Sequence, residues 1–165
     1  DLKNEFIAWW SNVSIRFEIP RTYSKLSMQT AEKQLHLFCD ASEEAYAVCA
    51  YLLLKEGNES EVSLIMSKSR VKPLKVLSIP RLELMGAVIA TRILTFIRYH
   101  LKMDDVEVKI WTDSTIVLDW VRSESSCLKV FVGNRVSEIQ SVLSPAAILW
   151  VPTDENPADL PSRGI

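Results

Sequence analysis

The sequence predicts one α/β domain, a five-stranded mixed sheet flanked by helices, preceded by a short N-terminal appendage. The chain has 165 residues, which suffices for a single domain with a substantial core. Its hydrophobic content of 48% and charged content of 24% are ordinary for globular proteins. Short apolar runs of strand character alternate with longer stretches of helical periodicity, which is the pattern of mixed α/β folds.

The appendage is predicted to cover residues 1–34 and the main domain residues 35–165. Residues 2–13 show an amphipathic helical pattern that includes three aromatic side chains. Residues 15–19 (IRFEI) alternate with period two until a proline stops the run. The polar stretch 23–34 is interpreted as a linker.

The main domain begins with three strands in a meander, and its later strands need crossover helices, so the sheet is expected to be mixed. The predicted strands are 35–40, about 45–54, about 61–69, 106–113 and 146–151. The predicted helices are 80–101, which opens on a proline, then one capped by Ser114 and running to about Val121, then about 128–143, and a short last segment 158–164.

Composition excludes several classes of protein. A net charge of −2 gives no whole-chain signature of a nucleic-acid binder, so a polyanion would need a local patch, metal ions or a neighbouring domain. The three cysteines, of which Cys39 and Cys49 lie in strand patterns, are interpreted as buried reduced thiols of a reducing compartment. The two histidines complete no zinc motif with them. Neither a membrane-spanning apolar run nor a signal peptide is recognised, so no membrane partner is expected.

Two predicted strands end on a carboxylate: LHLFCD ends on Asp40 and VEVKIWTD on Asp113. Aspartate is a poor strand former and is rarely buried without a partner. If the two strands are parallel neighbours, both carboxylates lie at the carboxyl edge of the sheet, where α/β proteins place their sites. Glu83, in the first turn of the long helix, and Asp159, at the start of the last helical segment, are the other candidates. Oxygen-rich clusters of this kind suit Mg²⁺.

Each of these four acids also has a purely structural interpretation. Glu83 could offset a helix dipole, Asp159 could cap a helix, and the two strand-end aspartates could begin turns. Their convergence favours a site, because crowded carboxylates repel one another unless divalent ions join them, and two such ions support phosphodiester hydrolysis. The remaining acids considered are expected to be solvated surface charges: Asp104, Asp105, Glu107, Asp119, Asp154 and Glu155.

A basic run precedes Glu83 without an intervening acid. It is interpreted either as a solvated loop or as an edge that contacts the phosphates of a nucleic acid. Its members are Lys68, Arg70, Lys72, Lys75 and Arg81.

Six phrases, in order, resemble the RNase H domain of a reverse transcriptase from a BEL/Pao-type LTR retrotransposon, within the ribonuclease H-like superfamily. They are FCDASEEAYA, SKSRVKPLK, IPRLELMGA, WTDSTIVLDW, FVGNRVSEIQ and VPTDENPADLPSRG. The resemblance covers roughly residues 35–164, and the segment before it is similar to the tail of the preceding connection region. One such phrase is weak evidence, whereas six in sequence are specific.

The resemblance implies an RNase H-like fold with the first and fourth strands adjacent, and hydrolysis of the RNA strand of an RNA–DNA hybrid to 3′-hydroxyl and 5′-phosphate ends. It implies two Mg²⁺ ions, with Mn²⁺ able to substitute. By motif, Asp40 would bridge both ions, Asp159 would complete the nucleophile-side ion, and Glu83 with Asp113 the leaving-group-side ion. Implied partners are the hybrid and the polymerase domain of the same polyprotein, in a cytoplasmic virus-like particle.

Backbone at Ala41 and Ser42, together with Glu83, would by the same resemblance sense the 2′-hydroxyls that distinguish RNA. Further residues expected to contact substrate are Lys72, Lys75, Arg81, Ser114 and Asn156. The chain departs from many RNases H in having no histidine within residues 150–158, which leaves that assisting role empty or filled by another group such as Asn156. The last helix is also short, which puts the turnover rate in question.

Two rival functions remain open at this stage. A DNA-directed superfamily member, such as a transposase or resolvase, is disfavoured by the order of the four acids, with Glu in the first long helix. A catalytically weak or inactive nucleic-acid-binding module is disfavoured because all four acids are present.

Overall fold

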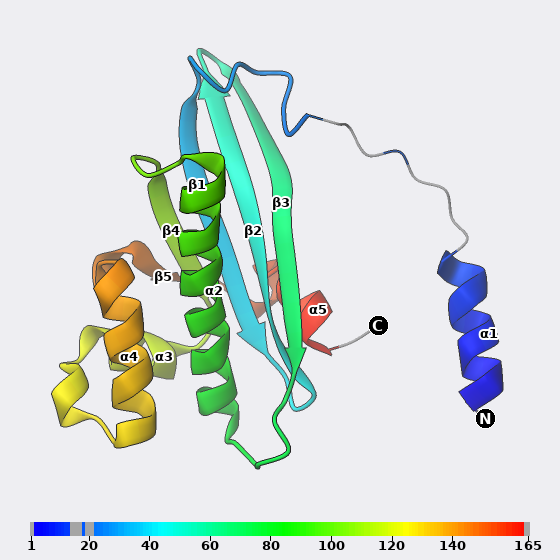
Figure 1. Ribbon diagram of the computed structural model, residues 1–165, viewed down its shortest axis with the longest axis vertical. Coiled ribbons are helices and arrows are strands. Elements are labelled where there is room, and N and C mark those ends of the chain that lie inside the picture. Colours follow the sequence, from blue (N-terminus) through cyan, green and yellow to red (C-terminus); the bar gives the residue numbers. More distant parts are fainter. Residues whose placement is uncertain (1, 14–17, 19–21, 164–165) are drawn as a thin grey trace.

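The computed structural model describes residues 2–13, 18 and 22–163 and confirms the predicted order of elements (Figure 1). The helices are α1 (Leu2–Val13), α2 (Ile79–Leu101), α3 (Thr115–Arg122), α4 (Val130–Val142) and α5 (Asp159–Arg163). The strands are β1 (Glu32–Ala41), β2 (Ala45–Glu56), β3 (Glu59–Val71), β4 (Glu107–Thr112) and β5 (Ile148–Trp150).

The five strands form one mixed sheet in the order β3-β2-β1-β4-β5. The first three strands are antiparallel neighbours, whereas β1 pairs with β4, and β4 with β5, in parallel. The predicted adjacency of the first and fourth strands is therefore confirmed. The last parallel pair joins Cys39 to Thr112, so the residues that follow them, Asp40 and Asp113, meet at the same edge.

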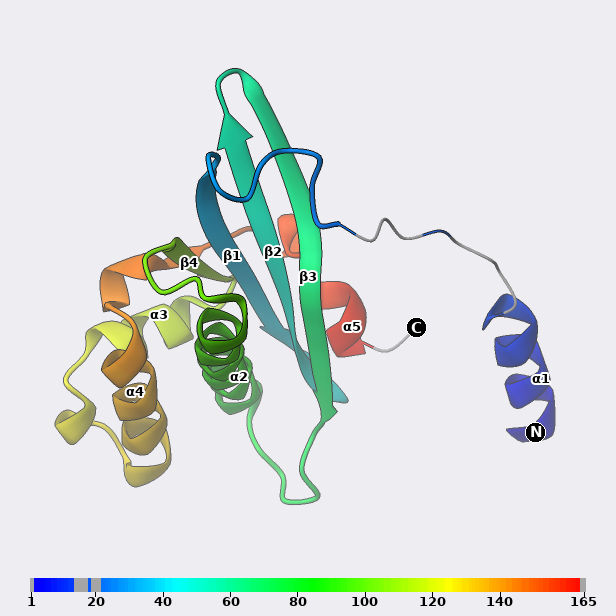
Figure 2. The same ribbon diagram turned by 45° about the horizontal axis from the view of Figure 1, so that its top comes forward.

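The core lies between the sheet and α2, with α3 and α4 on the same side and α5 on the other (Figure 2). Leu35, Leu37 and Cys39 of β1 are fully buried and alternate with side chains of the opposite face. Burial of such side chains contributes roughly 1.5–3 kcal/mol each. By length and composition alone α2 would suffice to cross a membrane, contrary to expectation, but 56% of the apolar window is buried here, as befits a core helix.

Two local expectations change, and two others are left untested. β1 begins at Glu32, inside the predicted linker. Its first residues continue the ladder with β2, with Glu32 opposite Lys55, although no apolar alternation marks them as a strand in the sequence. Cys39 and Cys49 are buried free thiols as predicted, and burial raises the pKa of Cys39 to about 12, but Cys127 is exposed on a helical turn. The predicted run 15–19 lies outside the described residues except for position 18, and the domain boundary after residue 34 stays a prediction.

Candidate active site

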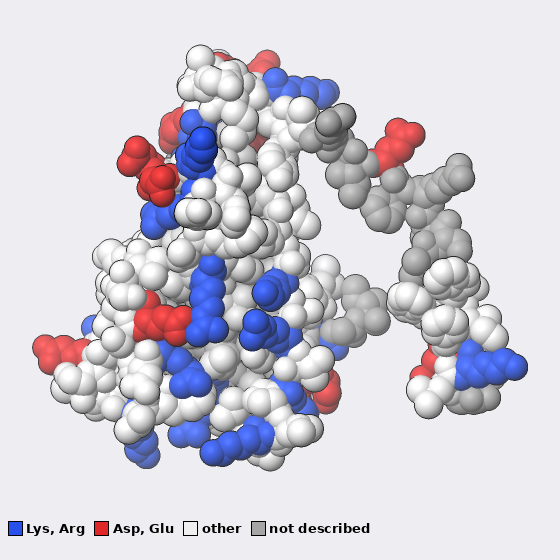
Figure 3. Space-filling model, viewed as in Figure 1, with Lys and Arg blue, Asp and Glu red and all other residues white. Residues whose placement is uncertain are grey.

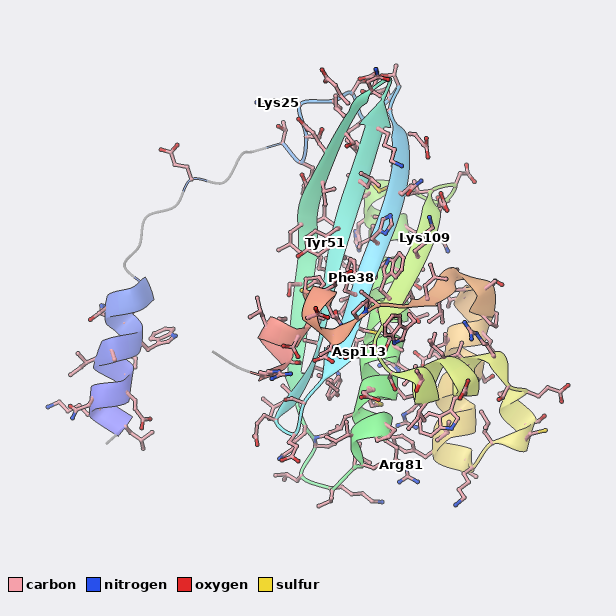
Figure 4. The ribbon with its side chains drawn as sticks, turned by 180° about the vertical axis from the view of Figure 1, so that it is seen from behind. Lys25, Phe38, Tyr51, Arg81, Lys109 and Asp113 are labelled. Carbon is pink, nitrogen blue, oxygen red and sulfur yellow. The ribbon has the colours of Figure 1, made fainter. Side chains whose placement is uncertain are left out.

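Asp40 lies at the end of β1, one residue before its last, and Asp113 directly follows β4, as Figure 4 shows for Asp113. Asp40 is only 6% exposed and Asp113 is half-buried. Ser114, the next residue, is the predicted cap of α3, its hydroxyl accepting the Val117 N–H at 3.3 Å. Parallel pairing thus brings both predicted aspartates to the same edge of the sheet.

Glu83 is brought to this edge by α2. The helix begins at Ile79, one residue earlier than predicted, so Glu83 is its fifth residue and lies just beyond the first turn. Gly86 follows three residues later, and a Cβ there would stand 3.3 Å from the carbonyl oxygen of Asp40 and 3.5 Å from Cβ of Cys39. The missing side chain therefore allows the helix to approach the end of β1 closely. Sequence reasoning missed Gly86, whose only signal is a glycine inside an apolar helical face.

Asp159 opens α5, which is fastened to β1 by buried polar side chains. The Asn156 amide donates to the carbonyl of Cys39 at 3.1 Å, and its oxygen accepts the Ala158 N–H at 3.1 Å. Asn156 is buried, and these bonds give its amide an internal role. Its predicted contact with substrate stays a prediction.

Ser162 connects two of the acids and was not predicted from the sequence. The residue is fully buried, and the single proton of its hydroxyl lies within reach of two acceptors, the Asp40 carboxylate and the carbonyl oxygen of Asp159 at 2.9 Å. The Ser42 hydroxyl donates to the carbonyl of Ser162 at 2.6 Å. The first and last acids of the site are therefore held by one serine, whose role depends on a contact across 122 residues of chain.

Asp40 lies within electrostatic reach of Asp113 and Asp159, and Glu83 within reach of Asp113 and Asp40. Burial raises the pKa of Asp40 above its ordinary value, as do the nearby charges of Asp113 and Asp159, while the bond from Ser162 acts in the opposite sense. Burial likewise raises the pKa of Glu83, with the charges of Asp113 and Asp40 adding to it and a Ser114 hydrogen bond opposing it. A bound cation would relieve mutual repulsion of this kind.

Two of the acids take separate partners. Asp113 Oδ2 accepts from the Thr153 hydroxyl at 2.7 Å, whereas its Oδ1 is buried with no hydrogen-bond partner. Asp159 pairs with Arg163 at 2.8 Å. Within the described part of the chain, no three His, Cys, Asp or Glu side chains form a group that would hold a metal ion, so the predicted four-acid ligand set stays a prediction. The all-oxygen donors and the orphaned Oδ1 nevertheless fit a hard divalent cation.

The remaining predicted contacts have mixed surroundings. Ala41 ends β1 and is half-buried, and the Ser42 N–H already donates to the carbonyl of Ala45 at 2.8 Å. Ser114 is buried beneath the start of α3. These positions hold the edge together, and their contact with substrate stays a prediction.

The basic run lies at the exposed end of the sheet beside α2, where Lys and Arg gather (Figure 3). Lys72 forms an ion pair with Glu44 at 3.5 Å, a contact that the sequence alone does not reveal. The Arg81 guanidinium lies over the Phe131 ring, 5.1 Å from its centroid. Lys75 is exposed on the connecting loop. Sequence reasoning missed Arg92, which joins Lys68 and Arg70 around a hollow of about 300 Å³ and also pairs with Glu138 at 2.6 Å.

Comparison with known families gives a decisive match. The model of the Pao retrotransposon-like RNaseH-like domain matches residues 3–114. The chain belongs to this family. The match contains Asp40, Glu83 and Asp113, whereas Asp159 lies beyond it. No curated protein matches the chain.

Solved structures share the fold of this Pao family member at low identity. The N-terminal RNase H domain of rv2228c from Mycobacterium tuberculosis is 12% identical, with a TM-score of 0.51, over 76% of this chain and 86% of that one. LC11-RNase H1, isolated from compost by a metagenomic approach, is 13% identical, with a TM-score of 0.51, over 78% and 90%. The same protein in complex with an RNA/DNA hybrid gives 11% identity and a TM-score of 0.50, over 78% and 91%. These likenesses confirm the RNase H-like fold.

Proposed function

We propose that this Pao-family domain is a metal-dependent endoribonuclease that hydrolyses the RNA strand of RNA–DNA hybrids during reverse transcription of a retrotransposon. The observation that carries the proposal is the electrostatic interaction of carboxylates around the parallel ends of β1 and β4: the charges of Asp113 and Asp159 help to raise the pKa of Asp40, and those of Asp113 and Asp40 help to raise the pKa of Glu83. Family membership and the shared fold support it, as does the hybrid bound by LC11-RNase H1. The domain would act beside the polymerase domain of its polyprotein, inside a cytoplasmic particle.

The four acids Asp40, Glu83, Asp113 and Asp159 would hold Mg²⁺ or Mn²⁺. When bound, two such ions supply an activated water and stabilise the leaving oxygen. The chain's own part is to aim the ligands: Ser162 fixes one oxygen of Asp40, and Thr153 fixes one oxygen of Asp113 while leaving the other free. Asp159 would have to exchange its ion pair with Arg163 for the cation.

Substrate would be gripped by charge beside the acids. Lys75 and Arg81 would contact phosphates, and Lys72 would contribute once it leaves Glu44. Because the net charge of the whole chain is −2, this grip should be weak and sensitive to salt.

The test is cleavage of labelled RNA–DNA hybrid, double-stranded RNA and double-stranded DNA, each with Mg²⁺, Mn²⁺ or EDTA. The expected result is cutting of the RNA strand of the hybrid, with either metal and not with EDTA. Cleavage that persists in EDTA would contradict the metal mechanism. Equal cutting of double-stranded DNA would identify a DNA-directed nuclease, and hybrid binding without cleavage an inactive binding module.

A further inference from the structure

The sheet face opposite α2 carries an aromatic patch that the described residues leave largely uncovered. Phe38 of β1 and Tyr51 of β2 project from this face (Figure 4), and Trp111 of β4 lies on it beside them. The ring centroids of Phe38 and Tyr51 lie 5.8 Å apart, and those of Phe38 and Trp111 6.0 Å apart. All three side chains are only half-buried, because α5 reaches only the end of the sheet near the carboxylates.

The patch continues across the sheet to its β3 edge. A hollow of about 360 Å³ is bounded by Phe38, Tyr51, Leu53 and Val62. Val62, which is 64% exposed, also borders a second groove formed with residues 22–25. The open apolar face therefore runs to the point where the chain coming from α1 joins the sheet. Contiguous exposed apolar surface of this kind marks an interaction site.

The helix α1 has the complementary problem. Leu2, Phe6 and Trp9 follow the i, i+4, i+7 spacing of one helical side and are 84%, 59% and 53% exposed. The rings of Phe6 and Trp9 contact each other at 5.8 Å between centroids and form an apolar ridge. Isolated helices shorter than about 12–15 residues are marginal in water, so a helix of 12 residues depends on a surface that buries this ridge.

The connection between the two surfaces is short and fixed at one end. The Ser24 hydroxyl and the Lys25 N–H, the latter at 2.8 Å, both donate to Glu61 of β3, and the Ser63 hydroxyl donates to the carbonyl of Tyr23. From α1 to this anchor the chain can span up to about 30 Å, at about 3.3 Å per residue. Crossing from β3 to β4 takes only about 14 Å, at about 4.8 Å per strand. A tether of this length keeps α1 at high effective concentration near the face.

We propose that α1 docks, within the same chain, on the open sheet face, placing its Leu2, Phe6 and Trp9 side over the hollow formed by Phe38, Tyr51 and Val62. The family match covers residues 3–114, so it includes nearly all of α1 together with strands β1 to β4. Docking buries both apolar surfaces and gives the short helix the packing that it needs. The inference is independent of the proposed nuclease activity.

Thermal unfolding of the full chain tests the proposal. Phe6→Ala with Trp9→Ala should lower the midpoint by roughly 3 °C or more, since burial is lost although alanine favours the helix. Val62→Thr, which keeps shape and strand propensity, should also lower it, and its effect should shrink in the α1 double variant because the two sites contact each other. Asn4→Ala, on the polar side of α1, is the matched control and should leave the midpoint unchanged.

Unchanged midpoints for the α1 double variant would overturn the proposal, as would additive effects of the two sites. Sedimentation over a wide range of protein concentrations should show a monomer throughout. A dimer whose formation accounts for the stabilisation would show instead that the face takes α1 of a second copy. Cross-linking in a Cys127→Ser background provides a second readout. A cysteine at Trp9→Cys should form a cross-link with one at Leu64→Cys, within one chain, far faster than one at Ala8→Cys does. Equal rates for the two positions would contradict docking.

Discussion

Two neighbouring residues of α2 belong to regions of opposite character. Leu84 belongs to the apolar interior beneath the helix, and Glu83 to the edge of the sheet that carries the carboxylates. Leu84 is fully buried among apolar side chains. Its neighbour Glu83 is half-buried among groups of its own charge, which helps to raise its pKa. The difference shows that the interior stabilises the fold, whereas the carboxylates at the edge lower its stability, a cost that the proposed cation would offset.

The largest contrast is expected from changing these two neighbours separately. Leu84→Ala should lower the free energy of unfolding by about 2–5 kcal/mol through the cavity that it leaves, with cleavage retained by the folded fraction. Glu83→Gln should reduce cleavage by at least about a hundredfold, the scale on which lost electrostatic stabilisation acts, without loss of stability. Chemical denaturation and cleavage rates should be measured on both variants. The contrast between the two regions fails if both substitutions change the same property.

Gly86→Ala tests the contact that joins the two regions. The new methyl group would meet the Asp40 carbonyl oxygen at 3.3 Å, so α2 should shift away from β1 and carry Glu83 with it. We expect about a tenfold loss of cleavage, while better helix propensity offsets roughly 1 kcal/mol of the strain. Gly133→Ala is the control: its methyl group would meet the Ser125 carbonyl oxygen at 2.6 Å, away from the edge, so it should lower stability and spare the rate of the folded enzyme.

A smaller effect is expected from Ser162→Ala, which removes the donor to Asp40. The carboxylate would lose its fixed orientation, so the Mg²⁺ concentration for half-maximal cleavage should rise several-fold, with a loss of stability of about 1–3 kcal/mol. Titration of cleavage and of the melting temperature with Mg²⁺ measures both. Ser141→Ala, an exposed serine on α4, is the control, and an unchanged Mg²⁺ requirement in Ser162→Ala would show that its role is structural only.

The smallest effect should come from the basic run, which lies outside both regions. Lys72→Ala with Lys75→Ala should weaken hybrid binding for all sequences alike and flatten its salt dependence by at most about two units. Because Lys72 already pairs with Glu44, we expect the change in salt dependence to lie in the lower part of that range. Rates measured against hybrid concentration at several salt levels decide this, with recovery expected at high substrate. No change at any salt level would mean that the run is a solvated loop.

Much of this architecture was accessible from the sequence because it depends on local patterns. Alternating apolar residues predicted the strands, and strands that end on Asp40 and Asp113 predicted a polar edge. Gly86 and Ser162 were not predicted, because their roles depend on contacts between segments distant in the chain. The pairing of Lys72 with Glu44 was missed for the same reason.

The most direct test of this account is the melting temperature of Asp40→Asn against wild type, with EDTA or Mg²⁺, across pH. The folded state raises the pKa of Asp40 above its ordinary value of 3.8. The protonated side chain therefore contributes stability that is fully present below pH 3.8. This stability is lost as the pH rises through the raised pKa, because the fold disfavours the charged form. In EDTA, Asp40→Asn should therefore match wild type at about pH 4 and melt at a higher temperature than wild type as the pH approaches neutrality. The exposed control Asp119→Asn should show no such gain.

With Mg²⁺ at neutral pH, wild type should gain stability and Asp40→Asn should not, while the variant loses cleavage of the hybrid. That combination would establish Asp40 as a metal ligand held at a cost to the fold. A variant that melts clearly below wild type in EDTA at neutral pH would contradict the account and make Asp40 a structural turn residue.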